Sequence, residues 1–441
     1  MNKSIITSLS LVTALGTACS VAAEPAATPE RPNIVLIFTD DMGWADIGLL
    51  GYHEDVRTPQ LDQLARDGIL FTDGYITAPQ CAPSRAGLMT GRYQQRFGLE
   101  HIAFGPLPLE EVTLADRLGE LGYRNGMVGK WHLEPNNATR LWAAENVPDY
   151  DPNARIWIRW PHTEGYRPED RGFHDVFFGE YNAGWANFDL EGNTVDPMRR
   201  IQGPDCRINS QTEAGLAFIR RQADSEDPFF LYLAYYAPHV PLAASEEDLA
   251  LFDDSHSVRR QYGLAMIHAM DRGLGRIREL LEEQGMTENT LIIFSSDNGA
   301  PMLSHMDNRH TIEGNGWTGS FNEPLRGEKG MLTEGGIRVP FVLAMPGTVP
   351  GGRMESTPVS AIDLAPTFLA SAGVETMPET FDGVDLWPLL LGGELAERAL
   401  FWRFWGQSAV RQGPWKLLSV GNRLRLFNFE NDKEEAHDLS E

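Results

Sequence analysis

The sequence predicts an α/β fold in which a large, doubly wound mixed sheet is flanked by helices and followed by a small antiparallel sheet. Two observations predict the large sheet: short continuous apolar runs recur along the chain, and segments with helical spacing lie between them. A third observation predicts the small sheet, because after Met377-Pro378 short apolar runs alternate with Gly and Asn turns. The chain has 441 residues, enough for one large core and a smaller unit, since single cores stop growing near about 250–300 residues.

Four apolar runs predict parallel strands that are buried on both faces and end in polar residues. They are Asn33 to Phe38 before Thr39-Asp40-Asp41, Gly122 to Val128 before Gly129-Lys130-Trp131-His132, Phe229 to Tyr236 before Ala237-Pro238-His239, and Leu291 to Phe294 before Ser295-Ser296-Asp297-Asn298. Helices are expected at Leu61 to Gly68, Leu114 to Leu121, Glu213 to Gln222 and Tyr262 to Gln284. Phe341 to Met345 reads as a further strand, and Ile362 to Ala372 as the helix that closes the large domain.

The last part of the chain predicts four short antiparallel strands. They are expected at Leu400 to Trp402, Ala409 to Arg411, Trp415 to Leu418 and Leu424 to Phe427. We therefore divide the chain into a large domain at 24–376 and a small sheet subdomain at 377–441. The irregular segments 136–161 and 301–322 have the composition of lids or substrate walls, although a surface insertion would look the same.

Residues 1–23 are typical of a secretory signal peptide. Lys3 gives the positive start, a short apolar stretch follows, and small residues end at Ala22-Ala23. A lipoprotein signal through Cys19 is the alternative, but Gly16 stands where a large aliphatic residue is usual. No later segment is long and apolar enough to cross a bilayer. We expect an exported protein, periplasmic or secreted, without stable membrane insertion.

The net charge argues against a nucleic-acid-binding protein, and the cysteine content argues against a fold held together by disulfides. The formal net charge of −25 argues against a nucleic-acid partner, because phosphate binding needs clustered Lys and Arg. An anionic substrate would require the basic residues to converge on one pocket. Of three cysteines, signal cleavage would leave Cys81 and Cys206, so at most one disulfide is expected and the core must hold the fold together.

The ends of the four strands predict a single site, because ligands bind outside the carboxyl ends of strands in open α/β sheets. Asp40, Asp41, Asp297 and Asn298 offer hard oxygen ligands and no sulfur, which suits Ca²⁺ or Mg²⁺ better than zinc. Each pair taken alone would equally suit a helix cap or a turn. Lys130, His132 and His239 would bring cations to the same place.

Cys81 is expected at a helix N-terminus, because Pro83 suits a first helical turn and the free N–H groups there favour anions. Arg85 lies four residues later and so shares a helix face with Cys81. A buried structural thiol is the alternative for this cysteine.

The segment Cys81-Ala82-Pro83-Ser84-Arg85, with Leu88 and Thr90-Gly91, resembles the signature of the type I, formylglycine-dependent sulfatases of the alkaline phosphatase-like superfamily. Gly129 to His132, Ala237 to His239 and Leu325 to Gly330 also look like sulfatase segments, and the resemblance runs from Pro32 to about Leu439. Glu134 departs from the pattern, since a glycine usually follows the His-Leu pair. The helix that many relatives append at the C-terminus is not found after Leu439.

This resemblance implies an exported sulfatase that acts on sulfated carbohydrate, and a maturation enzyme that oxidises Cys81 to Cα-formylglycine. One Ca²⁺ would be held by Asp40, Asp41, Asp297 and Asn298 with an oxygen of residue 81. Lys130, His132, His239 and Lys329 would surround the sulfate, with Arg85 among the catalytic residues. The hydrated aldehyde would attack sulfur, His239, alone or with Lys329, would protonate the departing alcohol, and His132 would take a proton in the step that restores the aldehyde.

The substrate is predicted only as a class. Candidate contacts on the loops are His101, His162, Trp185 and His305, together with Arg140, Arg155, Arg159 and Trp317. Two alternatives stay open at this point. One is a phosphonate or phosphate ester hydrolase of the same superfamily, and the other is a sulfated-glycan binder that never acquires the aldehyde.

Overall fold

The computed structural model describes residues 31–148, 150–151, 158, 160–179, 182–252, 257–302 and 311–440. Its main element is a ten-stranded mixed sheet with strand order β11-β2-β10-β9-β1-β8-β4-β5-β6-β7. The four strands expected from apolar runs form its centre: β1 (Asn33–Asp40), β4 (Arg124–Gly129), β8 (Phe229–Pro238) and β9 (Thr290–Ser296). They run parallel to one another. The predicted fold class is confirmed.

The two sides of the sheet add shorter strands. On one side lie β10 (Phe341–Ala344), which is antiparallel to β9, then β2 (Ile69–Phe71) and β11 (Arg353–Glu355). On the other side β5 (Asp175–Phe178) pairs with the hairpin of β6 (Ala183–Phe188) and β7 (Thr194–Gln202). Only β10 among these was predicted.

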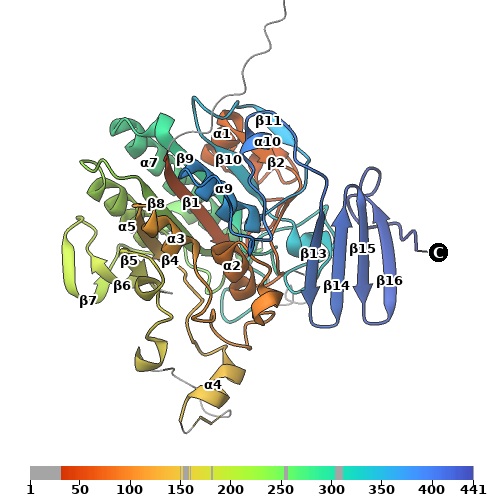
Figure 1. Ribbon diagram of the computed structural model, residues 1–441, viewed down its shortest axis with the longest axis horizontal. Helices are drawn as coiled ribbons and strands as arrows, with labels where there is room; N and C mark the ends of the chain where they lie inside the picture. The colour runs from red at the N-terminus through yellow and green to blue at the C-terminus, as the bar shows by residue number, and fades with distance from the viewer. Residues whose placement is uncertain are drawn as a thin grey trace, which may run out of the picture.

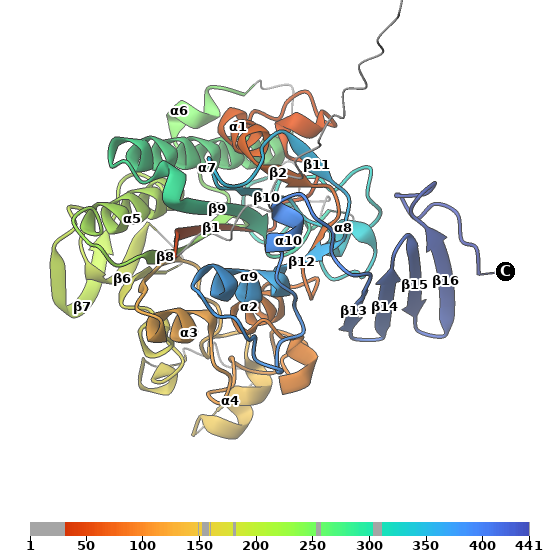
Figure 2. The same ribbon diagram turned by 45° about the horizontal axis from the view of Figure 1, so that its top comes forward.

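Helices cover both faces of the sheet (Figures 1 and 2). One face carries α1 (Pro59–Asp67), α5 (Arg207–Arg221) and α7 (Val258–Glu283), and the other carries α2 (Cys81–Thr90), α3 (Leu114–Glu120) and α9 (Leu364–Ser371). Successive side chains of a strand point to opposite faces. Val35 and Ile37 of β1 accordingly pack in one core cluster, and Leu36 and Phe38 in the other.

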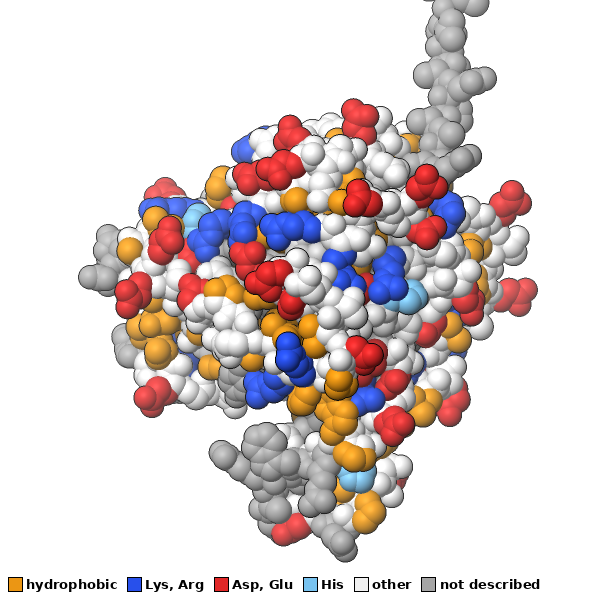
Figure 3. All heavy atoms as spheres, turned by 90° about the vertical axis from the view of Figure 1, so that its left-hand side faces the viewer, with side chains coloured by type: hydrophobic (Ala, Val, Ile, Leu, Met, Phe, Trp, Pro, Cys, Tyr) orange, Lys and Arg blue, Asp and Glu red, His pale blue; other side chains and the backbone are white. Residues whose placement is uncertain are grey.

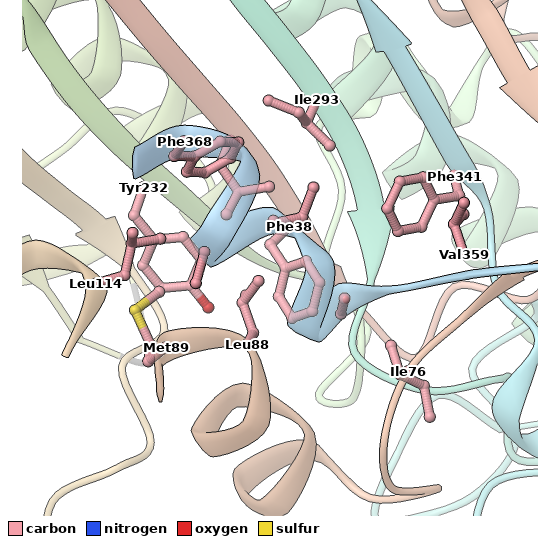
Figure 4. Close-up of a cluster of buried hydrophobic side chains, with 14 of the residues drawn as sticks. Phe38, Ile76, Leu88, Met89, Leu114, Tyr232, Ile293, Phe341, Val359 and Phe368 are labelled. Carbon is pink, nitrogen blue, oxygen red and sulfur yellow. The ribbon is translucent and has the colours of Figure 1, made fainter. Parts of the chain in front are cut away.

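The helix α2 lies wholly inside the protein, since all ten of its residues are buried. Its Leu88 lies near Phe38 of β1, and Met89 lies near Tyr232 of β8 (Figure 4). Burying a large apolar side chain contributes about 1.5–3 kcal/mol. The packing therefore fixes the first residue of this helix, Cys81, relative to the ends of β1 and β8.

The C-terminal strands form a separate antiparallel sheet in chain order (Figure 1). They are β13 (Ala399–Phe404), β14 (Gln407–Gln412), β15 (Trp415–Val420) and β16 (Arg423–Asn428). The domain limits 24–376 and 377–441 stay a prediction, and α10 (Trp387–Leu390) packs into the large core. The remaining short strands and α-helices are β3 (Gly74–Tyr75), β12 (Val359–Ser360), α4 (Arg140–Asn146), α6 (Glu246–Leu249) and α8 (Glu334–Ile337).

Buried ion pairs join the small sheet to the large core. Lys416 of β15 lies 2.8 Å from Glu334 of α8 and 2.8 Å from Glu435, and all three side chains are fully buried. Arg338 also pairs with Glu334, at 3.3 Å. Burial alone would raise the pKa of Glu334, but Lys416 and Arg338 lower it to about 2. Glu334 is therefore ionised at neutral pH.

Replacing Glu334 with Gln is expected to destabilise the protein by about 3 kcal/mol or more, because breaking a buried ion pair leaves an uncompensated charge. The folded pKa of Glu334 lies below its ordinary value of 4.5, so this stabilisation is complete above pH 4.5 and is lost as the pH falls towards 2. Urea unfolding at several pH values measures both effects. Glu100→Gln is the matched control, because Glu100 pairs with the exposed Arg403 and should cost about 1 kcal/mol or less.

One face of the molecule carries basic and acidic side chains in separate bands. On the face that carries α5 and β7, a band of Lys and Arg side chains is flanked on both sides by acidic ones (Figure 3). Within the described residues, the helices are all too short or too polar to cross a membrane.

Candidate active site

The ends of β1 and β9 bring three carboxylates to Cys81. The two strands are parallel neighbours, and Thr39 pairs with Ser296 in register, so the residues that follow them lie side by side. The backbone N–H of Asp297 donates to the carbonyl of Thr39 at 3.1 Å. Asp40, Asp41, Cys81 and Asp297 place one ligand atom each within 4.8 Å of one another, and all four are buried. The structure thus brings together residues that are up to 257 positions apart in the chain.

Asn298 completes this group and offers an oxygen atom that could bind a cation. Its Nδ2 donates to Asp41 Oδ1 at 2.6 Å and to the carbonyl of Gly299 at 2.9 Å. Its Oδ1 is buried and has no hydrogen-bond partner within the described part of the chain. An unsatisfied buried acceptor costs about 1–3 kcal/mol. A hard cation would satisfy it together with the three carboxylates, so the donor set fits Ca²⁺.

Two residues of the site have left-handed backbone conformations. The φ angle is 67° at Asp41 and 61° at His132. Such conformations cost about 1–3 kcal/mol for residues other than Gly, and they persist where the surrounding structure holds them. Gly129 has a different constraint, because a Cβ there would lie 2.0 Å from the carbonyl oxygen of Ala234. The segment that carries Lys130 and His132 therefore starts, at the end of β4, in close contact with β8.

Cys81 is the first residue of α2, as predicted, and its side chain has polar neighbours. The thiol donates to Asp40 Oδ1 at 3.4 Å and accepts from Lys329 Nζ at 3.2 Å. Burial, and then the charge of Asp297, raise the pKa of the Cys81 thiol to about 12. Because the thiolate is the nucleophilic form of cysteine, the unmodified side chain is unreactive at neutral pH.

Arg85 lies behind Cys81 and is fully buried. Its Nε and Nη2 donate to Asp297 Oδ2 at 3.0 and 2.8 Å. Its Nη1 donates to the carbonyl of Lys130 at 3.1 Å and to the hydroxyl of Tyr232 at 2.9 Å. One guanidinium therefore joins the ends of β9 and β4 to the middle of β8. The sequence analysis missed Tyr232, because this residue lies within the apolar run Phe229 to Tyr236 and reads there as a packing residue.

A cavity of about 580 Å³ adjoins this group and has Asp41 in its wall. Four basic side chains expected from the sequence lie in its wall: Lys130, His132, His239 and Lys329. The basic residues thus converge on one pocket in a chain of net charge −25. The irregular segments also contribute to the wall, through Asn136, Asn137, Ala138, Asn315 and Gly316.

The two lysines are held by the carboxylates. Lys130 pairs with Asp40, and Lys329 Nζ lies 2.6 Å from Asp41 Oδ1. Burial opposes a charge on either lysine, but Asp40 raises the pKa of Lys130 and Asp41 raises that of Lys329 well above its usual value. Both side chains therefore carry a positive charge at the cavity.

The two histidines are held so that each can exchange a proton. His239 Nδ1 lies 2.6 Å from the carbonyl oxygen of Val240, which only accepts, so Nδ1 carries a proton. Its Nε2 lies 3.7 Å from Asp41 Oδ2 in the cavity wall. Burial lowers the pKa of His239; burial and the charge of Lys130 lower the pKa of His132 well below its usual value. His132 is therefore a neutral base.

The sequence analysis missed Arg207 and Tyr236, which also line the cavity. Arg207 Nη2 donates to the carbonyl of His239 and, at 3.0 Å, to that of Pro241. Its guanidinium lies 5.5 Å from the ring centre of Tyr236. Arg207 is the first residue of α5, where the helix dipole disfavours a cation. The sequence could not reveal this position, because the helix was expected to begin only at Glu213.

The predicted substrate contacts are dispersed. Trp185 lines a second hollow, described below, and His162 belongs to the neighbouring 3-10 helix Trp160–Thr163. His101 packs on Phe404 and Trp405, with ring centres 5.8 and 4.9 Å away, although its neighbour Ile102 lines the cavity.

The remaining loop candidates do not form a common wall. Trp317 is buried and donates to the carbonyl of Ser320 at 2.6 Å, which is a packing role. Arg140 begins α4 and is exposed. His305, Arg155 and Arg159 lie outside the described residues. Cys81 and Cys206 are both free thiols.

Comparison with known proteins identifies the family. The sulfatase family model matches residues 32–374, and the model of the C-terminal region of N-sulphoglucosamine sulphohydrolase matches residues 327–441. N-acetylgalactosamine-6-sulfatase of Canis lupus familiaris is 33% identical over 406 residues, covering 86% of this chain and 69% of the relative. Arylsulfatase A of Homo sapiens is 34% identical over 412 residues, covering 88% and 75%.

A solved structure is also similar to this chain. The crystal structure of Ps i-CgsB in complex with k-i-k-neocarrahexaose has a TM-score of 0.75 and 32% sequence identity, and the match covers 93% of this chain and 89% of that one. The family model covers most of the chain, and the same chain carries the Cys81 segment and the assembled strand ends. This chain belongs to the type I sulfatase family of the alkaline phosphatase-like superfamily, and it is a sulfuric ester hydrolase.

Proposed function

We propose that this protein is an exported, calcium-dependent sulfatase that hydrolyses sulfate esters of carbohydrates, with a formylglycine made from Cys81 as its nucleophile. The observation that carries the proposal is the convergence of Asp40, Asp41 and Asp297 on Cys81 beneath a cavity lined by basic side chains. The export signal at 1–23 is a feature of the sequence. Maturation would need a partner enzyme that oxidises residue 81 before the core closes over it, since Cys81 is buried in the folded chain.

The ion would be held by Asp40, Asp41, Asp297, Asn298 and residue 81. When bound, calcium and the aldehyde would supply an activated oxygen nucleophile and part of the charge balance for the sulfate. The protonated thiol of Cys81 offers no such nucleophile at neutral pH. Arg85 has a positioning role here, because its two hydrogen bonds fix the Asp297 carboxylate from behind.

The lysines bind and orient the sulfate group. Lys130 and Lys329 carry charges at the cavity and are fixed by Asp40 and Asp41, so they need little reorganisation when a sulfate arrives. Fixed charges of this kind stabilise negative charge on the equatorial oxygens as the ester bond breaks.

The histidines move protons. His239 Nδ1 keeps its proton on the Val240 carbonyl, so Nε2, which faces the cavity, is the atom that would take up a second proton and deliver it to the departing alcohol. Burial lowers the pKa of His239, and the charges of Asp40 and Asp41 favour this doubly protonated form. Lys329 lies in the same wall and can assist. His132, kept neutral by burial and by Lys130, is placed to accept a proton in the step that frees residue 81.

The relatives favour a carbohydrate substrate. One is named N-acetylgalactosamine-6-sulfatase, and one solved structure is a complex with k-i-k-neocarrahexaose. The rival reaction within the superfamily is hydrolysis of phosphonate or phosphate esters. Rates on 4-nitrophenyl sulfate, 4-nitrophenyl phosphate and a phenylphosphonate monoester separate the two. We expect the highest kcat/KM on the sulfate; a higher value on either phosphorus ester would overturn the proposal. A glycan binder without catalysis is excluded if the matured protein turns over any sulfate ester.

The metal site gives a further prediction. Asn298→Ala should weaken Ca²⁺ binding by about 10-fold or more, because it removes a buried oxygen donor that the surrounding protein leaves unpaired. Calorimetric titration of chelator-treated protein with CaCl₂ measures the affinity. Asn209→Ala is the control, since Asn209 bonds to Asp205 on the surface. Wild-type affinity in Asn298→Ala would show that this side chain is not a ligand.

A further inference from the structure

A second hollow of about 240 Å³ adjoins the catalytic cavity. The two share four residues in their walls: Glu134, Asn136, Asn137 and Tyr236. Sites for drug-sized ligands measure about 300–1,000 Å³, so the second hollow suits one ring rather than a chain of them. A molecule seated in the catalytic cavity could therefore extend into it past this shared wall.

Three tryptophans line the second hollow, namely the buried Trp131 and the partly exposed Trp160 and Trp185. Trp160 comes from the 3-10 helix Trp160–Thr163 and Trp185 from β6, and their ring centres are 4.7 Å apart. Trp160 is 40% exposed and Trp185 37% exposed. A single exposed aromatic residue needs no explanation. Two that pack together in a concave site beside a catalytic cavity form a rigid apolar surface with polar edges, which suits the face of a sugar ring.

The charged groups of this hollow do not favour an anion. Glu134 places a carboxylate in its wall. The guanidinium of Arg167 lies 4.4 Å from the ring centre of Trp160, and its Nε is 3.0 Å from Glu169 and 3.4 Å from Asp170. Arg167 thus has two carboxylates beside it and serves to hold Trp160. The described residues of the hollow therefore favour a neutral ring face over a second sulfate group.

We propose that the hollow walled by Trp160 and Trp185 is a subsite for the sugar residue adjacent to the sulfated one, so that the enzyme prefers a sulfate ester within an oligosaccharide to the same ester on a monosaccharide. This inference rests on the proposed function. The shared residues Asn136 and Asn137 lie where the linkage between the two sugars would pass. The amide of Asn136 donates to the carbonyl of Glu134 and accepts from the backbone N–H of Ala138, so the amide of Asn137 is the group that can bond to the linkage oxygens.

The test compares kcat/KM for a sulfated monosaccharide with that for an oligosaccharide containing it. The pairs are sulfated galactose with carrageenan oligosaccharides, and sulfated N-acetylgalactosamine with chondroitin sulfate oligosaccharides. For the pair that is hydrolysed, we expect the oligosaccharide to be favoured about 10-fold or more, and Trp185→Ala to bring this ratio close to one. Trp185→Phe should restore part of the ratio. Trp415→Ala is the matched control, because Trp415 is similarly exposed on strand β15 of the C-terminal sheet.

The outcomes separate the two proposals. Equal kcat/KM for the monosaccharide and the oligosaccharide in the wild type would overturn the subsite and leave the sulfatase proposal intact. A ratio that persists in Trp185→Ala, with the melting temperature unchanged, would likewise overturn it. Absence of turnover on every sulfate ester by protein carrying formylglycine would overturn the proposed function, and the subsite with it.

Discussion

Cys81→Ala should lower kcat by about 10⁴-fold or more, on the scale seen when a nucleophile is removed from an enzyme. The reason is local: no other nucleophilic side chain among the described residues shares the position beside Asp40 and Lys329. Binding of the sulfate group should largely survive, because Lys130 is held by Asp40 and Lys329 keeps its ion pair with Asp41 when its hydrogen bond to the thiol is lost. Turnover is followed with a sulfate ester, and binding with the same ester in calorimetry.

Protein made without the maturation enzyme should be as inactive as Cys81→Ala. Its thiol has a pKa of about 12 and stays protonated. Peptide mass spectrometry shows whether residue 81 is a thiol or an aldehyde in each preparation. Cys206→Ala is the matched control and should keep its activity, since Cys206 is also a buried free thiol but precedes α5 and does not belong to the group that joins Cys81 to Asp40 and Asp297. Full turnover by protein whose residue 81 is unmodified cysteine would contradict the account.

His239→Gln should separate good from poor leaving groups. If His239 Nε2 protonates the departing alcohol, kcat/KM on a carbohydrate sulfate should fall by about 10²–10⁴-fold. On 4-nitrophenyl sulfate, whose phenolate leaves without protonation, the loss should be about 10-fold or less. The measurement is kcat/KM for wild type and variant on both esters.

His437→Gln controls for the loss of a histidine as such, because the His437 side chain is 82% exposed near the chain's end. It should match the wild type on both substrates. An equal loss in His239→Gln on the phenyl and carbohydrate esters would mean that His239 binds sulfate and does not act as the acid.

The centre of the fold could be predicted because its strands are buried on both faces. Such strands have to be continuously apolar, as Ile34 to Phe38 is, and no surface strand needs that pattern. The outer strands gave no such signal. β7 (Thr194–Gln202) is mostly exposed and contains Asp196, Pro197, Arg199 and Arg200, while β2 and β11 have three residues each. Their pairing comes from the neighbouring strands rather than from their own sequence.

The site residues that come just after strands could be predicted from the sequence. Asp40, His239 and Asp297 stand two or three residues after apolar runs, and parallel strands in one sheet must bring such residues to one edge. The left-handed conformations of Asp41 and His132 depend on contacts made only in the folded chain. The same is true of Arg85, whose link to Asp297 exists because β1 and β9 are neighbours, an order that the sequence does not state.

The substrate contacts were the least predictable, because loops have no periodicity to constrain their position. Trp185 and Trp317 looked equivalent in the sequence. In the fold, Trp185 is partly exposed in a hollow beside the cavity, whereas Trp317 is buried against Phe321, with ring centres 4.9 Å apart. The difference arises from β6, which carries Trp185 on the second strand from the edge of the large sheet.

The most direct test of the central claim is an anomalous difference map from crystals of the matured protein grown with Ca²⁺. The account predicts one calcium peak about 2.3–2.6 Å from oxygens of Asp40, Asp41, Asp297 and Asn298, in contact with an oxygen on residue 81. Fully active crystals with no peak at this position, or with calcium bound only elsewhere, would contradict it.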